Sequence, residues 1–203
     1  MSSQPASQRS PELWLLRHGA TAWAQQGRHT GRTDVPLLPE GEEEALLLAP
    51  LLQSLAFDAV LVSPRQRAQR TCALAGLGAQ AEISDDLCEW DYGDYEGITT
   101  AEIRRSVPEW TVWTHPCPGG ESAASVQQRC ERLIDQSLAR MGEQRRIALF
   151  AHGHILRSLA GCWLGLGVAG GALLVLETGT VSVLGQERQR RALLRWNAPA
   201  VSP

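Results

Sequence analysis

The sequence LWLLRHGAT at residues 13–21 decides the fold, because an apolar run ends there at an arginine, a histidine and a glycine. Four consecutive apolar residues predict a strand that is buried on both faces, as in a parallel sheet. Ligands of open α/β sheets bind beyond the carboxyl ends of the strands, where Arg17 and His18 would lie. Gly19 would allow a sharp turn and a close approach to a ligand.

A second stretch repeats this pattern. Residues 147–153, IALFAHG, again predict a buried strand that ends in His-Gly, and a helix is expected over 155–166. One such histidine could equally be a structural hydrogen-bonding residue. Two of them together with arginines favour a functional site, and we expect His18, His152, Arg17 and Arg67 to surround one anion-sized space.

Composition limits the possible functions of the chain. Its 203 residues suit one domain that folds without disulfides or metals. The net charge of −3 and the pI near 6.0 argue against a nucleic-acid partner. All 19 basic residues are arginines, which excludes a lysine Schiff base and a phosphate-loop lysine. An anionic substrate must therefore be held by arginine or histidine, and the arginine fork suits phosphate oxygens.

Cysteine usage and hydropathy predict a cytoplasmic protein with no membrane partner. The five scattered cysteines contain no C-x-x-C pair and are typical of a reducing compartment. Residues 1–11 lack the apolar core of a signal peptide, and no stretch approaches the ~20 apolar residues that cross a bilayer. We expect a disordered tail at 1–11, a single domain at 12–197 and a second tail at 198–203.

Strand-like and helical segments alternate along the chain, which predicts an α/β fold with a central sheet covered on both faces. Pro50 should kink or divide the helix that begins at Pro39. The acidic first turn of that helix complements its dipole, which explains these charges better than a metal site would. The expected strands are 13–16, 59–62, 81–84, 147–152, 173–176, 181–184 and 192–196, and the other expected helices begin at 63, 99 and 122.

Three arginines follow a helix start at Ser63-Pro64, where cations oppose the helix dipole. This placement is explained if an anion binds at that helix N-terminus, with Arg67 close to it. We assign Arg65 and Arg70 to the surface. Farther on, residues 99–121 are irregular and rich in tryptophan and proline, so this segment either covers the site or is a surface loop pinned by its tryptophans.

Residues 17–23, RHGATAW, resemble the R-H-G-x-T-x-W signature of the histidine phosphatase superfamily, which includes the cofactor-dependent phosphoglycerate mutases. The resemblance continues through the blocks at 27–37, 63–68, 89–97 and 150–154, and covers about 13 to 185. The blocks EWDYGDYEG, FAHGH and ETGT are most similar to sugar-phosphate phosphatases typified by fungal sedoheptulose-1,7-bisphosphatase. This resemblance implies a phosphoglycerate mutase-like, three-layer α/β/α sandwich with a mostly parallel sheet.

The resemblance also implies a role for each matching residue. His18 would be the nucleophile that forms a phosphohistidine, and Glu89 would be the proton donor. From the residues alone, Asp91, Asp94 and Glu96 are equal alternatives to Glu89. The groups that would hold the phosphate oxygens are Arg17, Arg67 and His152, and the other substrate-binding positions are Thr21, Arg28, Thr30, Gly31, Tyr92 and Gly153.

The expected function is a metal-independent phosphomonoester hydrolase that needs no cofactor and acts on a small phosphorylated metabolite, such as a sugar (bis)phosphate. His152-Gly153-His154 lacks a third ligand at a recognisable spacing, so no metal site is predicted. Ala20, Ala24 and Trp90 depart from the mutase pattern and favour a phosphatase. One alternative is a phosphoglycerate mutase. The other is a non-catalytic phosphoprotein-binding module, and the intact set of five catalytic residues argues against that module. The oligomeric state stays open.

Overall fold

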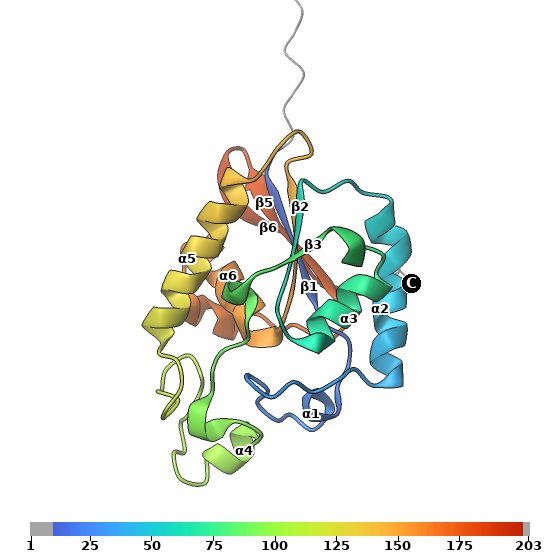
Figure 1. Cartoon of the computed structure of the whole chain (residues 1–203). Coiled ribbons are helices and arrows are strands. Elements are labelled where there is room, and N and C mark those ends of the chain that lie inside the picture. Colours follow the sequence, from blue (N-terminus) through green and yellow to red (C-terminus); the bar gives the residue numbers. More distant parts are fainter. Residues whose placement is uncertain (1–9, 201–203) are drawn as a thin grey trace, which may run out of the picture.

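The computed structural model describes residues 10–200, which form a six-stranded sheet with helices on both faces (Figure 1). The strand order is β3-β2-β4-β1-β5-β6. The strands are β1 (Glu12–Arg17), β2 (Ala59–Val62), β3 (Ala81–Ile83), β4 (Arg146–Ala151), β5 (Val181–Glu187) and β6 (Arg190–Ala198). The expected three-layer α/β/α sandwich is confirmed.

Helices α2 and α3 pack on one face of the sheet, and α5 and α6 pack on the other (Figure 1). The α-helices are α1 (Ala22–Gln25), α2 (Pro39–Gln53), α3 (Gln66–Leu74), α4 (Thr100–Ile103), α5 (Ala123–Ala139) and α6 (Gly153–Trp163). The short 3₁₀ turns are η1 (Gly78–Gln80), η2 (Asp85–Leu87), η3 (Gly93–Tyr95) and η4 (Val168–Leu173).

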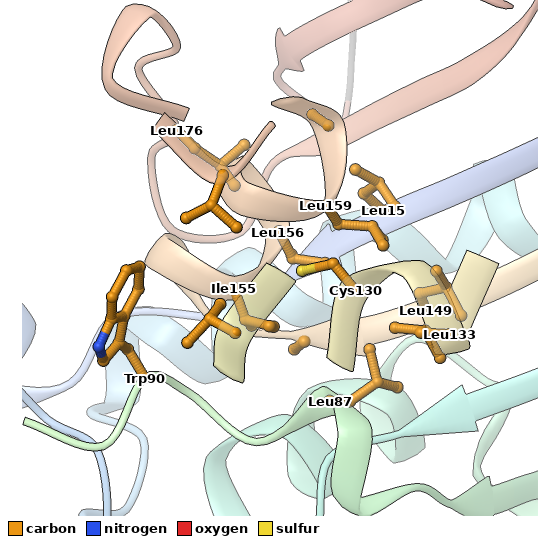
Figure 2. Packing of buried hydrophobic residues seen from close by; sticks show 14 of the residues in the cluster. Leu15, Leu87, Trp90, Cys130, Leu133, Leu149, Ile155, Leu156, Leu159 and Leu176 are labelled. Atoms are coloured by element: carbon orange, nitrogen blue, oxygen red, sulfur yellow. The ribbon is translucent and has the colours of Figure 1, made fainter. Parts of the chain in front are cut away.

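The first strand is buried on both faces, as its apolar run predicts. Leu13 and Leu15 pack in the cluster with α5 and α6, whereas Trp14 and Leu16 pack in the cluster with α2 and α3. Figure 2 shows Leu15 of β1 among side chains of α5 and α6. The alternation follows from the pleat, because successive side chains of a strand point to opposite faces.

The sheet is mostly parallel, and its register aligns the two histidine strands. Strands β3, β2, β4 and β1 pair in parallel, and β5 and β6 form an antiparallel edge. Arg17, the last residue of β1, pairs with Ala151, the last residue of β4. His18 and His152 therefore leave the same edge of the sheet side by side.

One expected strand, at 173–176, is absent. This segment forms the end of η4 and an irregular stretch, with Leu173 78% exposed and Val175 64% exposed. Both edges of β1 are already occupied by β4 and β5, so the short apolar run has no place beside that central strand. Its last residue, Leu176, is buried and points its carbonyl group at Arg17.

One predicted helix start is wrong, and one predicted helix break is absent. Helix α3 begins at Gln66 rather than at Ser63, because the Ser63 hydroxyl is hydrogen bonded to His152 and does not cap the helix. Helix α2 is not divided at Pro50, which is an exposed residue in its last turn. A proline there removes only one hydrogen bond near the helix end, where water can solvate the freed carbonyl group.

The expected tails lie largely outside the described residues, which exclude 1–9 and 201–203. At the two ends of the described part, Pro11 is buried and Ala198 is the last residue of β6. Within residues 10–200, no helix is both long and apolar enough to cross a membrane.

The 99–121 segment lies beyond the carboxyl edge of the sheet, beside the loop that carries α1 (Figure 1). A bridge between Arg28 and Thr99 joins the two segments, and Thr99 and Glu102 form a capping box at the start of α4. Trp110 is fully buried, whereas Thr100 lines the cavity described below. The segment therefore both covers the site and is pinned by a tryptophan.

Candidate active site

A polar cavity of about 240 Å³ opens at the carboxyl edge of β1 and β4. Its walls come from the end of β1, the loop around α1, the 89–92 loop, the start of α4 and the N-terminal half of α6. The lining residues are Arg17, His18, Thr21, Ala24, Gly27, Arg28, His29, Thr30, Glu89, Tyr92, Thr100, Gly153, His154, Arg157 and Leu176. A larger cavity of about 690 Å³ lies beside α3 and β3 and contains none of the predicted catalytic residues.

The tautomer of His18 follows from its one hydrogen bond. Its Nδ1 lies 2.7 Å from the carbonyl oxygen of Gly19, which can only accept, so Nδ1 carries the proton and Nε2 carries the lone pair. Burial, together with the positive charges of Arg67 and Arg17, lowers the pKa of His18 well below its usual value. The imidazole is therefore neutral at pH 7 and chemically able to act as a nucleophile.

The loop that holds His18 is fixed by contacts that the motif does not reveal. The backbone N–H of Gly19 donates to the Thr71 hydroxyl at 3.1 Å, and that of Ala20 donates to the Glu44 carboxylate at 2.9 Å. A Cβ atom at position 19 would clash with the carbonyl oxygen of Gly41, so α2 can pack here only against glycine. Glu44 thus has a positioning role beyond complementing the dipole of α2.

Arg67 and His152 lie behind His18 and are not part of the cavity lining. Arg67 is fully buried and donates through Nε to His152 Nδ1 at 3.1 Å, and its Nη atoms donate to the carbonyl groups of Thr30 and Thr33. His152 Nε2 lies 2.7 Å from the Ser63 hydroxyl. Because Nδ1 accepts, His152 is neutral, and burial with the charge of Arg67 lowers its pKa well below the usual range.

The two imidazole rings are neighbours, with centroids 5.2 Å apart. Arg67, which donates to His152, thus lies one side chain away from the His18 ring. The four groups lie close together, but of the four the cavity is lined by His18 and Arg17 alone. The expectation that all four surround one space is therefore wrong for Arg67 and His152, which form a supporting layer behind the wall.

The guanidinium of Arg17 lies at the start of α6. It donates through Nη1 to the carbonyl oxygen of Leu176, and a Cβ atom at Gly153 would lie 3.5 Å from Cζ of Arg17. Its Nε has no hydrogen-bond partner in the protein. Burial lowers the pKa of Arg17, and the nearby Glu89 carboxylate opposes that shift.

Glu89 lies at the N-terminus of α6. Its Oε1 accepts from the backbone N–H groups of Trp90 at 2.9 Å and Ile155 at 2.8 Å, and Oε2 accepts from that of His154 at 2.9 Å. Backbone donors at a helix N-terminus stabilise a negative charge. Among the described residues, Glu89 is the one carboxylate in the cavity lining; its three alternatives Asp91, Asp94 and Glu96 lie outside it.

Most of the expected substrate-binding residues lie in the wall. Gly31 does not, because its backbone N–H donates at 3.0 Å to the Glu96 carboxylate. The residues that do line the cavity are Thr21, Arg28, Thr30, Tyr92 and Gly153. The side chain of Thr21 also caps α1 by accepting from the backbone N–H of Ala24.

Three wall residues, His29, His154 and Arg157, were not predicted as site residues. His29 follows the polar loop around α1 but is buried, and burial lowers its pKa to about 4. His154 Nδ1 lies 2.6 Å from the Tyr92 hydroxyl. The one available sequence signal was helical spacing, since Arg157 lies four residues after Gly153 and hence on the same face of α6.

Two departures from the mutase pattern have clear structural settings. Ala24 lines the cavity, and its methyl group is all that this position offers to a ligand. Trp90 is buried in the core and donates through Nε1 to the carbonyl oxygen of Glu121 at 3.1 Å. In the described part of the chain, no group of three His, Cys, Asp or Glu side chains could hold a metal ion.

Comparison with known proteins agrees with this architecture. The sequence model of the Histidine phosphatase superfamily (branch 1) matches residues 13–199. An acid phosphatase of Mycobacterium tuberculosis is 43% identical over 187 residues, covering 91% of each chain. Sedoheptulose 1,7-bisphosphatase of Saccharomyces cerevisiae is 36% identical over 188 residues, covering 78% of this chain and 69% of the yeast protein.

A solved structure also matches closely. The structure of an open reading frame from Mycobacterium tuberculosis superposes with a TM-score of 0.90 at 40% identity, covering 95% of this chain and 100% of that one. The sequence and the structure thus lead to the same conclusion: the chain belongs to the histidine phosphatase superfamily and is a phosphatase.

Proposed function

We propose that this phosphatase is a metal-independent phosphomonoester hydrolase that acts on a small phosphorylated metabolite, a sugar phosphate or bisphosphate, through a phosphohistidine on His18. The neutral imidazole of His18 carries the proposal. Its Nδ1 is held by the Gly19 carbonyl group, its Nε2 keeps the lone pair, and it lines a polar cavity together with Arg17 and Glu89.

In the first step, Nε2 of His18 attacks phosphorus, the P–O bond to the ester oxygen breaks, and a phosphohistidine forms. Arg17 binds phosphate oxygens, because it reaches the wall and its Nε has no protein partner. Arg67 is hydrogen bonded to His152, whose ring contacts that of His18. Its buried, preorganised positive charge stabilises the negative charge that the phosphoryl group brings to His18.

Glu89 supplies the proton for the leaving oxygen. Three backbone N–H donors hold its carboxyl group at the cavity wall. A phosphate dianion beside it disfavours that second negative charge and promotes proton uptake. Glu89 then protonates the leaving alkoxide, and in the second step it takes a proton from the water that attacks phosphorus and breaks the P–N bond.

A sugar phosphate is supported by the size of the cavity and by the named relatives. A volume of about 240 Å³ suits a small metabolite rather than a folded phosphoprotein surface. One relative is named for hydrolysis of sedoheptulose 1,7-bisphosphate. Trp90 is buried where the mutases have an arginine, and Ala24 offers only a methyl group where they have a side chain that touches phosphate, which favours hydrolysis over mutase activity.

Phosphate release tests the reaction class. We expect release from at least one of a panel of sugar bisphosphates, sugar monophosphates and phosphoglycerates, with a chelator present throughout. Loss of activity on every substrate after chelation would contradict the metal-free mechanism. Interconversion of phosphoglycerates that depends on a bisphosphate primer, with little phosphate release, would instead identify a mutase.

A trapping experiment tests the acceptor. Brief exposure to ³²P-labelled substrate should leave acid-labile, base-stable label on the wild-type protein and none on the His18→Ala variant. His115→Ala provides a matched control, because that histidine belongs to the 99–121 segment and lies outside the cavity. Label that persists on His18→Ala would eliminate His18 as the acceptor.

A further inference from the structure

Arg157 lines the catalytic cavity but has no part in the proposed phosphoryl transfer. It lies on α6, one helical turn beyond Gly153 and on the same face. Gly153 is the position over which Arg17 lies. The two guanidinium groups thus follow one another along the cavity wall, with Arg17 beside the nucleophile and Arg157 farther along the helix.

The side chain of Arg157 is held in place from two sides. Its Nε donates to the carbonyl oxygen of Gly171 at 3.0 Å, and its Cζ lies 4.9 Å from the ring centroid of Trp113. The Trp113 ring in turn packs so close to Gly171 that a Cβ atom there would lie 2.7 Å from it. These contacts fix the plane of the guanidinium before any ligand binds.

The charge of Arg157 is not neutralised by the protein. Within residues 10–200, no carboxylate lies within 4.0 Å of its nitrogen atoms, and no hydrogen bond from either Nη atom is formed to the protein. The oxygens of the nearest acidic residue in the wall, Glu89, already accept three backbone hydrogen bonds. Burial and the like charge of Arg17 both disfavour the cation, although Glu89 partly offsets them.

A fixed, half-buried cation without a counter-ion in a phosphatase cavity is suited to an anion. We propose that Arg157 determines specificity by binding a second phosphate group of the substrate, distinct from the phosphate that is transferred to His18. This inference rests on the proposed function, and it deepens that function by selecting bisphosphorylated substrates. The planar fork of arginine can bind two oxygens of such a group at once.

The transferred phosphate is an unsuitable partner for Arg157. Arg17 and Arg67 are the charges that act on His18 and lower its pKa, and Arg17 is adjacent to it in the chain. Arg157 lies one turn of α6 beyond Gly153, the residue that borders the Arg17 guanidinium. Its guanidinium therefore serves the part of the cavity that receives the rest of the substrate.

The test compares one bisphosphate with its own monophosphates. For the wild-type enzyme, kcat/KM for fructose 1,6-bisphosphate should exceed that for fructose 1-phosphate and fructose 6-phosphate by about 10- to 100-fold, the range expected for hydrogen bonds to a charged group. Arg157→Gln should remove this preference by raising KM for the bisphosphate, with the monophosphate values changed less than about threefold. Arg157→Lys should keep part of the preference, since it retains the charge without the fork.

Arg105→Gln is the matched control, because Arg105 is exposed on the 99–121 segment and does not line the cavity. It should leave the ratio of bisphosphate to monophosphate activity unchanged. A wild-type enzyme without bisphosphate preference, or an Arg157→Gln variant that loses all three substrates equally, would overturn the inference. Because the wild-type ratio needs no variant, a ratio near one overturns the inference even if Arg157→Gln does not fold, and Arg157→Lys then supplies the variant comparison.

The same measurements separate this inference from the proposed function. An enzyme that hydrolyses p-nitrophenyl phosphate through His18 but ignores the second phosphate would refute only the role of Arg157. Phosphate release that continues in His18→Ala would refute the proposed mechanism instead.

Discussion

Glu89→Gln separates the acid role of Glu89 from its structural role. Glutamine keeps the shape of the side chain but cannot donate a proton to a leaving alkoxide or accept one from water. Its carbonyl oxygen can replace Oε1, which accepts from Trp90 and Ile155, whereas its NH₂ group must then face the N–H of His154. One buried backbone donor is left unpaired, at a cost of about 1–3 kcal/mol in the free energy of unfolding.

Such a loss corresponds to a fall in Tm of about 2–4 °C per kcal/mol for a chain of this length, so the variant should remain folded at 25 °C. Its kcat/KM for an alkyl phosphate should fall by about 10²- to 10⁴-fold, the usual contribution of general acid catalysis. With p-nitrophenyl phosphate, whose leaving group needs no proton, phosphorylation of His18 should be much less affected. Hydrolysis of the phosphohistidine should still be slow, because the same carboxylate activates water.

Stopped-flow absorbance gives the decisive readout. We expect a burst of nitrophenolate equal to the enzyme concentration in Glu89→Gln, followed by a slow steady state. The alkyl substrate should give no comparable burst of its alcohol product. An equal loss of phosphorylation rate with both leaving groups would show that Glu89 is not the acid, whatever the change in Tm.

Two further predictions concern the groups around His18. Thr71→Val should lower the free energy of unfolding by about 1–3 kcal/mol and reduce kcat, because the Gly19 N–H loses its buried acceptor. Thr71→Ser keeps the hydroxyl and should retain most activity. Equal losses of activity in the two variants would contradict this explanation. Burial lowers the pKa of His18 and His152 well below the 6.5 of an exposed imidazole. The unfolded chain therefore binds more protons near pH 6, so the free energy of unfolding should be steady above pH 7 and fall towards pH 5, by up to about 1.4 kcal/mol per pH unit for each group. Urea titrations at pH 7.5, 6 and 5 measure this, and a free energy of unfolding that is constant across them would refute it.

Several features of the fold could be predicted because they depend on neighbouring residues. The apolar run at 13–16 needs burial on both faces whatever its partners are, and Arg17, His18 and Gly19 mark where it must stop. The same reasoning at 147–153 located the second histidine. The 173–176 run shows the limit of this reasoning, because its apolar character was correct but no position beside β1 was open to it.

Contacts between distant segments could not be read in this way. Glu89 meets His154 across 65 positions, and Gly19 meets Thr71 across 52. No local pattern marks Thr71 as the residue that holds the nucleophile loop. His29 gave the opposite signal, since a polar loop predicts exposure, whereas packing against Tyr92, Trp110 and His154 buries it.

Short-range hydropathy and motif spacing were enough to locate β1 and β4, the two histidines that follow them and the family to which the chain belongs. The tertiary structure decided which groups form the cavity wall and which stand behind it. It placed Arg67 and His152 in a supporting layer and Arg157 in the wall against Trp113. Burial and electrostatic environment depend on how remote segments pack, and local sequence patterns do not specify that packing residue by residue.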